Sequence, residues 1–445
     1  MPKIGSQKCK QESKADQYND TELVKSIEQM TLEEVENKNT IKKAIHQSGQ
    51  YFTTNITLKK NVFDLIQNKP SLILEPSCGQ GDLIEYVTNK LRNVKFESYE
   101  IDKSIHLLPS IDKNIANVRH TDFLELEITK TFKTIIGNPP YVKTKTGNLY
   151  LKFIDTCFEL LENNGELIFI VPSDFIKITS SAKIINKMMK AGTFTDIIFP
   201  NNENLFKNAS IDVMIFRYCK DSTLPKKAPK KVIVRVGINE EQKKEEKYLI
   251  NTNGILTFSD TESTNQKTFL DYFDIYVGIV SGKESVFKNE EYGNVKILNN
   301  KNKMDDYILI EKLPSDNTKL VKYLEGKKTE LKERKIKKFT DENWFEWGAL
   351  RNYKTIKNKI KSDPNLECLY VKNITRDKEV CFKNKIQLFG GGLIIMIPKK
   401  KIDLDVVANH INSLEFRNNY MYSGRFKMGH KQLCNCLFNI PTNFI

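Results

Sequence analysis

The chain has 445 residues, a length that suffices for two or three domains with cores of their own. Hydrophobic residues make up 39% of it, the ordinary share for a soluble globular protein, and no apolar run is long enough to span a membrane. The net charge of +14 favours a polyanionic partner such as a nucleic acid, although a lysine-rich proteome would give the same excess.

The first residues and the cysteines indicate the compartment. The N-terminus has no apolar core and therefore no secretory signal, and the eight cysteines are scattered without paired CxxC sets. We expect a protein of the reducing cytoplasm that has no contact with a membrane. Residues 1–45 are expected to form a polar tail and one helix, at 21–43, with no chemistry of its own.

A glycine-containing turn between a strand and a helix is the first sign of a cofactor site. Residues 72–74 form an apolar run typical of a buried strand, the turn at 75–83 contains Gly79 and Gly81, and a helix is predicted to follow. This order is the nucleotide-cofactor arrangement of doubly wound α/β sheets, and glycines permit close approach of the backbone. Glu75 would repel a pyrophosphate, so a cofactor with a cationic amino-acid end fits better.

Three further strands are predicted to end in polar residues. The run at 96–102 places Glu100 where two ribose hydroxyls would be held, and the next run ends with Asp122 and Phe123, an acceptor and an apolar face for a purine. The last run lies at 132–137. Ligands of open α/β sheets bind at the carboxyl ends of the strands, where all of these groups would meet. Any one of these acids by itself could equally be a solvated surface residue.

The last strand leads into the turn Asn138-Pro139-Pro140-Tyr141. The Asn138 amide and the Pro139 carbonyl can accept hydrogen bonds from an exocyclic amino group, and Tyr141 can stack on the ring that carries this group. The other interpretation of these four residues is an ordinary proline-rich turn after a strand. The polar strand ends that precede the turn favour a binding site.

In this order and spacing the motifs resemble the S-adenosylmethionine-dependent N6-adenine DNA methyltransferases of type II restriction–modification systems. The match is to the gamma order, in which the cofactor motifs come first, NPPY next and the target-recognition region last, and it covers residues 47–218. It implies a Rossmann-like doubly wound α/β methyltransferase sheet in residues 46–221 and a C-terminal α+β DNA target-recognition domain in residues 268–445. Lysines and prolines predict that residues 222–267 form a basic linker region.

The resemblance also implies which residues hold the cofactor, S-adenosyl-L-methionine. They follow the first three strands or lie in the loop before them, apart from one proline of the NPPY turn. No metal is expected, because the spacing of His430, Cys434 and Cys436 does not suit zinc and buried thiols are the simpler interpretation. The predicted cofactor-binding residues are Thr53, Glu75, Ser77, Gly79, Glu100, Ile101, Asp122, Phe123 and Pro140.

The target base is expected to lie against the NPPY turn. The resemblance implies that Asn138 and the Pro139 carbonyl bind the N6 amino group and that Tyr141 stacks on the base. Phe206 is predicted to stack on its other face; Phe199 is the alternative, and a core phenylalanine is a third interpretation. Two acceptors would localise the nitrogen lone pair, so no strong base need act before the nitrogen attacks the methyl carbon.

The C-terminal half carries lysine-rich segments interleaved with aromatic residues and glycines, a composition typical of loops that contact phosphates and read bases. The main segments lie at 278–283, 344–351, 389–392 and 422–431. Surface lysines over an unrelated core are the alternative for most single residues. DNA contacts are predicted for Lys283, Arg351, Arg425 and Lys427.

Taken together, the sequence predicts a monomeric, bacterial or virus-encoded enzyme that methylates adenine N6 at specific sites in duplex DNA after flipping the base, and so protects DNA from a cognate restriction endonuclease. An RNA adenine methyltransferase and a protein glutamine methyltransferase are the alternatives. A catalytically inactive DNA-binding partner is a third, which the intact cofactor residues disfavour. A fused nuclease is disfavoured because no paired-carboxylate-plus-lysine signature is present.

Overall fold

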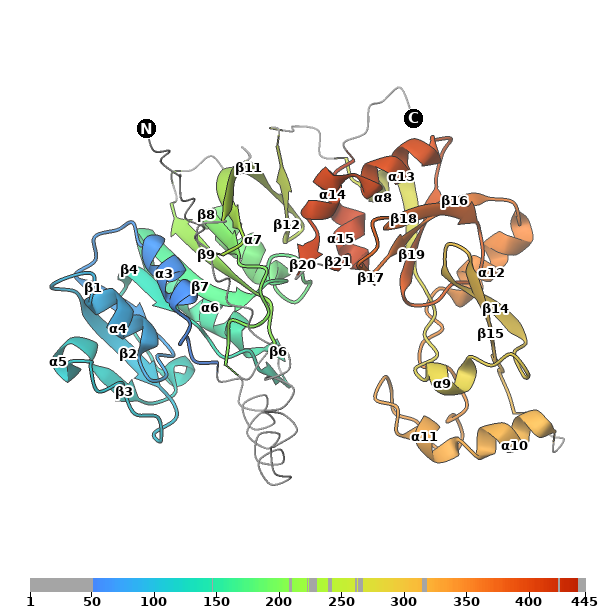
Figure 1. The fold of residues 1–445 in the computed structure, drawn as a ribbon, viewed down its shortest axis with the longest axis horizontal. Helices are drawn as coiled ribbons and strands as arrows, with labels where there is room; N and C mark the ends of the chain where they lie inside the picture. Colours follow the sequence, from blue (N-terminus) through green and yellow to red (C-terminus); the bar gives the residue numbers. More distant parts are fainter. Residues whose placement is uncertain are drawn as a thin grey trace, which may run out of the picture. The chain divides into compact units, whose positions relative to one another are not determined.

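A computed structural model describes residues 51–438 in one compact unit, and Figure 1 shows its fold. The tail and helix predicted for residues 1–45 lie outside the described residues. None of the helices in the described part is long and apolar enough to cross a membrane. Within 51–438 the residues not described are 146, 208–209, 222, 224–229, 239–241, 261, 263–266, 314–317 and 423–424.

The first half of the described chain is built on a mixed sheet of ten strands. Five of them, β3, β2, β1, β4 and β7, are parallel neighbours, and β9 runs antiparallel between β7 and β8. In spatial order the strands are β12 (Ile255–Ser259), β11 (Lys243–Thr252), β10 (Lys230–Val236), β8 (Gly192–Phe199), β9 (Val213–Lys220), β7 (Leu161–Pro172), β4 (Phe132–Gly137), β1 (Leu72–Glu75), β2 (Lys95–Glu100) and β3 (Val118–His120).

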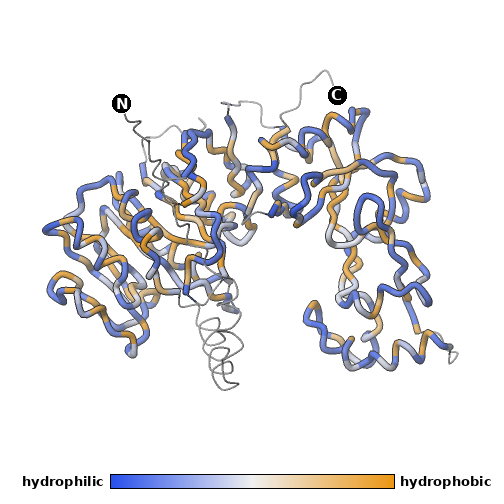
Figure 2. Tube along the Cα trace, in the orientation of Figure 1, coloured by the Kyte–Doolittle hydropathy of each residue, from blue (hydrophilic) through white to orange (hydrophobic). Residues whose placement is uncertain are grey.

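Helices cover both faces of this sheet because its central strands are apolar on both sides. Ile73 and Ile136 pack in one cluster with α3, α4 and α5, whereas their neighbours Leu74 and Ile135 pack in another with α6 and α7. Figure 2 shows the apolar stretches along these strands. The helices are α3 (Ile56–Asp64), α4 (Asp82–Thr88), α5 (Lys113–Ala116), the 3-10 turn η1 (Phe123–Glu125), α6 (Leu149–Glu159) and α7 (Ala182–Ala191), and a small hairpin joins β5 (Lys143–Thr144) to β6 (Gly147–Asn148).

The basic linker predicted for residues 222–267 is wrong for most of its length, since β10, β11 and β12 extend the large sheet. In β10, Val232 and Val234 are buried while Lys231 points to solvent. Alternation of this kind is the mark of a strand with one buried face. The many lysines at the outward positions hid this alternation in the sequence.

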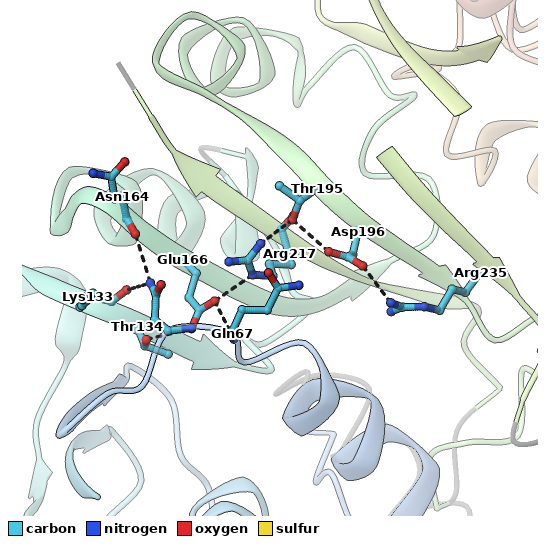
Figure 3. A network of polar contacts seen from close by, with 10 residues as sticks. Gln67, Lys133, Thr134, Asn164, Glu166, Thr195, Asp196, Arg217 and Arg235 are labelled. Carbon is cyan, nitrogen blue, oxygen red and sulfur yellow. Dashed lines mark hydrogen bonds and ion pairs between the residues drawn. The ribbon is translucent and has the colours of Figure 1, made fainter. Parts of the chain in front are cut away.

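A buried polar network ties the centre of the sheet to the loop after α3 (Figure 3). One oxygen of the Glu166 carboxylate accepts from Arg217 Nε at 2.8 Å and from the backbone N–H of Gln67 at 3.1 Å. The other accepts from Thr134 Oγ1 at 3.0 Å and from the backbone N–H of Asn68 at 3.0 Å. Both oxygens are therefore fully used inside the protein, as burial of a carboxylate requires.

The same network reaches the added strands. Arg217 Nη1 donates to Thr195 Oγ1 at 2.8 Å, and that hydroxyl lies 3.0 Å from Asp196 Oδ2. The other oxygen of Asp196 accepts from Arg235 Nη2 on β10 at 2.9 Å. This largely buried ion pair thus helps to fix β10 against β8.

The C-terminal half is an α+β structure, as predicted. Its central antiparallel sheet has the order β13 (Phe273–Val277), β19 (Leu393–Pro398), β16 (Glu367–Lys372) and β18 (Cys381–Lys385). Helix α13 (Leu404–Asn412) packs on one face, and α12 (Tyr353–Ser362) contributes to the cluster on the other. The remaining elements are α8 (Phe269–Tyr272), α9 (Glu284–Phe287), β14 (Val295–Asn300), β15 (Lys303–Tyr307), α10 (Lys319–Glu325), α11 (Lys328–Lys332), β17 (Ile374–Thr375), α14 (Leu414–Asn418), β20 (Met421–Tyr422), β21 (Arg425–Lys427) and α15 (His430–Asn435).

The aromatic residues of the segment at 344–351 are core residues. Trp344 and Trp347 are both buried, and the indole N–H of Trp347 donates to Ile308 O at 2.7 Å. Phe389 is buried as well. The interleaving of aromatic and basic residues here reflects a core beneath a charged surface, so these rings are not the base-reading groups that the composition suggested.

Candidate active site

The parallel arrangement of β3, β2, β1 and β4 brings their carboxyl ends to one edge of the sheet. Glu75 ends β1, Glu100 ends β2, and Asn138 directly follows β4. The structure therefore brings together the strand ends that the sequence singled out. The site has an acidic half around Glu75 and an aromatic half around Tyr141.

Glu75 is a buried acid whose surroundings disfavour its ionised form. Its side chain is 2% exposed, and burial, with Asp82 and Glu100 nearby, raises the pKa of its carboxyl well above the ordinary value. Glu75 Oε2 and the hydroxyl of Ser77 are buried and have no hydrogen-bond partner. Buried polar atoms without partners are rare, and here they indicate a place for a ligand that donates hydrogen bonds or carries positive charge.

Glu100 shapes the glycine turn beside this acid. One of its oxygens accepts from the backbone N–H of Gly79 and the other from that of Asp102, each at 2.9 Å. Gly79 has φ of 55°, and a Cβ at this position would come within 3.1 Å of the Phe52 ring. The left-handed conformation therefore favours glycine here, and a side chain would also press on the Phe52 ring.

The next two predicted residues differ in exposure. Ile101 is 63% exposed although it is apolar, which suits a residue that packs against a ligand. Phe123 is 2% exposed, and its ring packs between Tyr99 and Phe153 at centroid distances of 5.3 and 5.8 Å. Phe123 therefore belongs to the core, and a contact between its ring and a purine stays a prediction. Asp122 accepts from the backbone N–H of Leu124 at 2.9 Å and so caps η1.

The Asn138 amide is held in one orientation. Its Nδ2 donates to Tyr51 O at 2.7 Å and to Thr53 Oγ1 at 3.1 Å, which uses both of its hydrogens. Its Oδ1 is consequently the atom that remains for an incoming donor. Thr53 is buried and accepts one of these hydrogen bonds, and its predicted contact with the cofactor stays a prediction.

Tyr141 contacts the same oxygen. Its hydroxyl lies 2.5 Å from Asn138 Oδ1 and 3.1 Å from Ile170 O, yet it has one proton for these two acceptors. Burial, together with Tyr150 and Tyr51, raises the Tyr141 pKa well above its ordinary value, so the hydroxyl remains a donor. If the hydroxyl donates to Ile170 O, both lone pairs of Asn138 Oδ1 are available to accept from a substrate.

Three aromatic rings meet at this corner. Tyr51 stacks on Tyr141 at 5.4 Å with 30° between the planes, and Phe206 lies 5.7 Å from Tyr51 and 6.4 Å from Tyr141. Phe206 is therefore the better of the two predicted partners of Tyr141. The alternative, Phe199, packs against Phe258 at 6.3 Å.

Sequence reasoning missed two contributors to the site. These are the aromatic pair Tyr51 and Phe52, and the acid Asp82, to which the sequence motifs assigned no role. The available signal was an aromatic pair just before the hydroxyls of Thr53 and Thr54. Pro139 is buried and Pro140 half-buried beside Asn138, as a rigid turn requires.

The four residues predicted to contact DNA lie in different settings. Arg351 is exposed. The other three form ion pairs: Lys283 with Glu330 at 2.7 Å, Arg425 with Glu203 at 2.7 Å, and Lys427 with Asp174 at 3.5 Å. Their contacts with DNA stay predictions. Cys434 and Cys436 are buried thiols, and no metal-binding cluster of three or more His, Cys, Asp or Glu side chains occurs among the described residues.

Known proteins with similar sequences match the first half of the chain. The model of the Eco57I restriction-modification methylase family matches residues 8–206. The type II methyltransferase M.HincII of Haemophilus influenzae is 29% identical over 198 residues, covering 40% of this chain and 38% of that protein. The modification methylase CviBIII of Paramecium bursaria Chlorella virus NC1A is 30% identical over 168 residues, covering 33% of this chain and 44% of that protein.

The chain resembles the type II restriction–modification methylases. The resemblance predicted from the motifs is thereby confirmed for the region in which the motifs lie. The matched region spans less than half the length of these two curated relatives.

One solved structure extends the likeness to the C-terminal half. The type IIL restriction-modification enzyme MmeI in complex with DNA has a TM-score of 0.51 and 11% identity, covering 94% of this chain and 67% of that chain. At this identity the likeness concerns the fold alone. It confirms the predicted fold class, a methyltransferase-type α/β sheet followed by an α+β part.

Proposed function

We propose that this protein transfers a methyl group from S-adenosyl-L-methionine to the N6 amino group of adenine in duplex DNA. The observation that carries the proposal is the Asn138 amide, whose nitrogen is held by Tyr51 O and Thr53 so that its oxygen is left to accept. A fixed acceptor beside an aromatic ring suits a planar substrate with an amino group, and it lies at the same sheet edge as the acidic half of the site.

The acidic half fits the proposed cofactor. S-adenosyl-L-methionine supplies an electrophilic methyl group on a positively charged sulfonium. Glu75 Oε2 and Ser77 Oγ, which have no partner inside the protein, would hold its amino-acid end, and Glu100 its ribose. The cluster of Glu75, Asp82 and Glu100 favours a cation and disfavours the pyrophosphate of a dinucleotide. The exposed side chain of Ile101 would cover one face of the adenine.

Asn138 is the residue that activates the substrate nitrogen. Its Oδ1 accepts from the amino group, which draws the nitrogen lone pair out of conjugation with the ring and toward the methyl donor. Because the amide is already held by two hydrogen bonds, this orientation costs no further ordering when the substrate arrives. The Pro139 carbonyl would accept the second amino hydrogen, as the sequence predicts.

The base would be held by stacking. Tyr141 and Phe206 are the predicted stacking partners, and their rings lie 6.4 Å apart and nearly perpendicular. Extruding a base costs a few kcal/mol, and stacking on aromatic side chains returns about 1–3 kcal/mol per base. The two terms are similar in size, so the aromatic half of the site has the means to stabilise an extruded base.

The C-terminal half is proposed to bind and read DNA as a monomer, with Lys283, Arg351, Arg425 and Lys427 near the phosphates. The net charge of +14 and the fold likeness to an enzyme solved with DNA support this part of the proposal. Methylation would then protect the host or viral DNA from a cognate restriction endonuclease in the cytoplasm.

The test is a comparison of substrates. Purified protein is incubated with radiolabelled cofactor and with unmethylated duplex DNA, RNA or protein, and methylated positions are mapped by sequencing DNA from an expressing cell. Label in duplex DNA and N6-methyladenine at one recurring sequence are the expected results. Label in RNA or protein alone would establish one of the two alternatives, and no label in any substrate would establish an inactive binding partner.

A further inference from the structure

One face of the Tyr141 ring is already covered by another aromatic ring. Tyr51 lies on this ring at 5.4 Å and 30°, the arrangement of an offset stack. The other rings near Tyr141, Tyr150 and Phe206, stand nearly perpendicular to it at 6.2 and 6.4 Å. Among the described residues, Tyr51 is therefore the aromatic ring that is stacked on Tyr141.

Tyr51 also contacts the second predicted partner of the base. Its ring lies 5.7 Å from that of Phe206, which is 3% exposed. One side chain thus touches both residues between which the base is expected to lie. A purine stacked on the same face of Tyr141 would occupy the volume that the Tyr51 ring fills.

The backbone of Tyr51 is fixed while its side chain is the part that must move. Tyr51 O accepts from Asn138 Nδ2 at 2.7 Å, so the proposed catalytic amide holds this residue in place. Displacing the ring therefore requires rotation about the side-chain bonds and leaves the amide orientation intact. The base would then replace the Tyr51 ring as the stacking partner of Tyr141.

We infer that Tyr51 is a gate of the base pocket, whose ring takes the place of the target purine in the free protein and turns away when the base arrives. This inference rests on the proposed function. The gate keeps the aromatic surface of Tyr141 and Phe206 covered when no substrate is bound, and its displacement adds to the barrier for base extrusion. Tyr51 is a positioning residue that acts on access to Tyr141.

The test measures extrusion of the base directly. A duplex is made with 2-aminopurine at the position that sequencing shows to be methylated, and its fluorescence rise is followed after mixing with protein and S-adenosylhomocysteine. We expect Tyr51→Ala to speed the rise by about twofold to tenfold, the effect of losing one aromatic pair, and Tyr51→Trp to slow it. Tyr51→Leu tests the same point with an apolar side chain if the alanine variant is unstable.

Two controls separate the gate from general effects. Tyr51→Phe keeps the ring and should stay much closer to the wild type than Tyr51→Ala does. Tyr86→Ala removes a tyrosine from an aromatic pair with Phe63, at 5.9 Å, outside the site and should match the wild type. An unchanged or slower rise in both Tyr51→Ala and Tyr51→Leu would overturn the gate while the wild type still methylates DNA. If the wild type methylates no duplex, the proposed function fails and the gate fails with it.

Discussion

Two polar clusters in the same sheet differ in how their hydrogen bonds are used. Around Glu166, both carboxylate oxygens and the facing Arg217 have partners within the protein (Figure 3). Around Glu75, at the carboxyl edge, one carboxylate oxygen and the Ser77 hydroxyl have none. Both acids are almost completely buried. Burial therefore does not distinguish them, but the completeness of their hydrogen bonding does.

The difference separates stability from function. A buried charge with all of its partners holds strands together. Removing one partner leaves the other charge buried without compensation, which strongly destabilises the fold. A buried charge without partners destabilises the free protein and is kept because a ligand completes it. On this basis we interpret the Glu166 cluster as structural, and the Glu75 cluster is where we propose that the cationic cofactor binds.

The largest effect is expected from breaking the complete cluster. Glu166→Ala leaves Arg217 buried without its partner, and we expect the free energy of unfolding to fall by about 3–5 kcal/mol. Urea denaturation followed by circular dichroism measures this loss. The paired change Glu166→Met with Arg217→Met should lose much less, because no unpaired charge remains. A single variant as stable as the wild type would contradict the structural role.

At the carboxyl edge of the sheet, removing the Asn138 acceptor should lower the rate of methyl transfer and leave the stability of the fold unchanged. Asn138→Ala is expected to lower the rate of methyl transfer by about 10²–10³-fold, the usual effect of deleting one preorganised polar group. Cofactor binding, measured by calorimetry, should persist. Asn68→Ala is the matched control, because its amide bonds to the backbone at Lys133, near the start of β4, and at Asn164, whereas the NPPY turn follows the other end of β4; it should leave the rate unchanged.

Neutralising Glu75 should stabilise the free protein and weaken its binding of the cofactor. Glu75→Gln removes a buried charge, so the free protein should gain about 1 kcal/mol of stability at neutral pH while its affinity for the cofactor falls. Because burial raises the pKa of Glu75, its ionised form is the destabilising one, and the advantage of the variant should grow as the pH rises from about 5 to about 8. Thermal unfolding across this range checks the sign; an advantage that shrinks with pH would contradict it.

The smallest effect is expected on the surface of the added strands. Lys231 and Glu246 form an exposed pair at 2.7 Å on neighbouring strands β10 and β11. Lys231→Ala should leave the melting temperature unchanged within error, because water screens both charges. By contrast, Arg235→Ala should lower it, since Asp196 is buried and depends on that arginine. Equal changes in melting temperature would mean that burial does not determine how much these ion pairs contribute to stability.

The sequence predicted the edge of the sheet correctly because its signal is local. β1 and β4 are short, mainly apolar runs, each strand from β1 to β4 is followed by a polar turn, and parallel strands bring such turns together. Gly79, with its positive φ, and the prolines after Asn138 could also be read along the chain. The same local reading failed at β10–β12, where outward lysines concealed the buried valines.

What the sequence by itself determined was the succession of the first strands along the chain, the acids and amide at their ends, and the resemblance to the methylases. The tertiary structure alone decided that Asn138 presents its oxygen, since its nitrogen bonds to Tyr51 and Thr53, more than eighty positions away. It also decided that Tyr51 covers one face of Tyr141, and that Glu75 Oε2 has no partner while the Glu166 carboxylate has four. Periodicity fixes which side of an element is buried, but the partner of a buried group is chosen by contacts between distant segments, and these contacts separate the structural acid from the functional one.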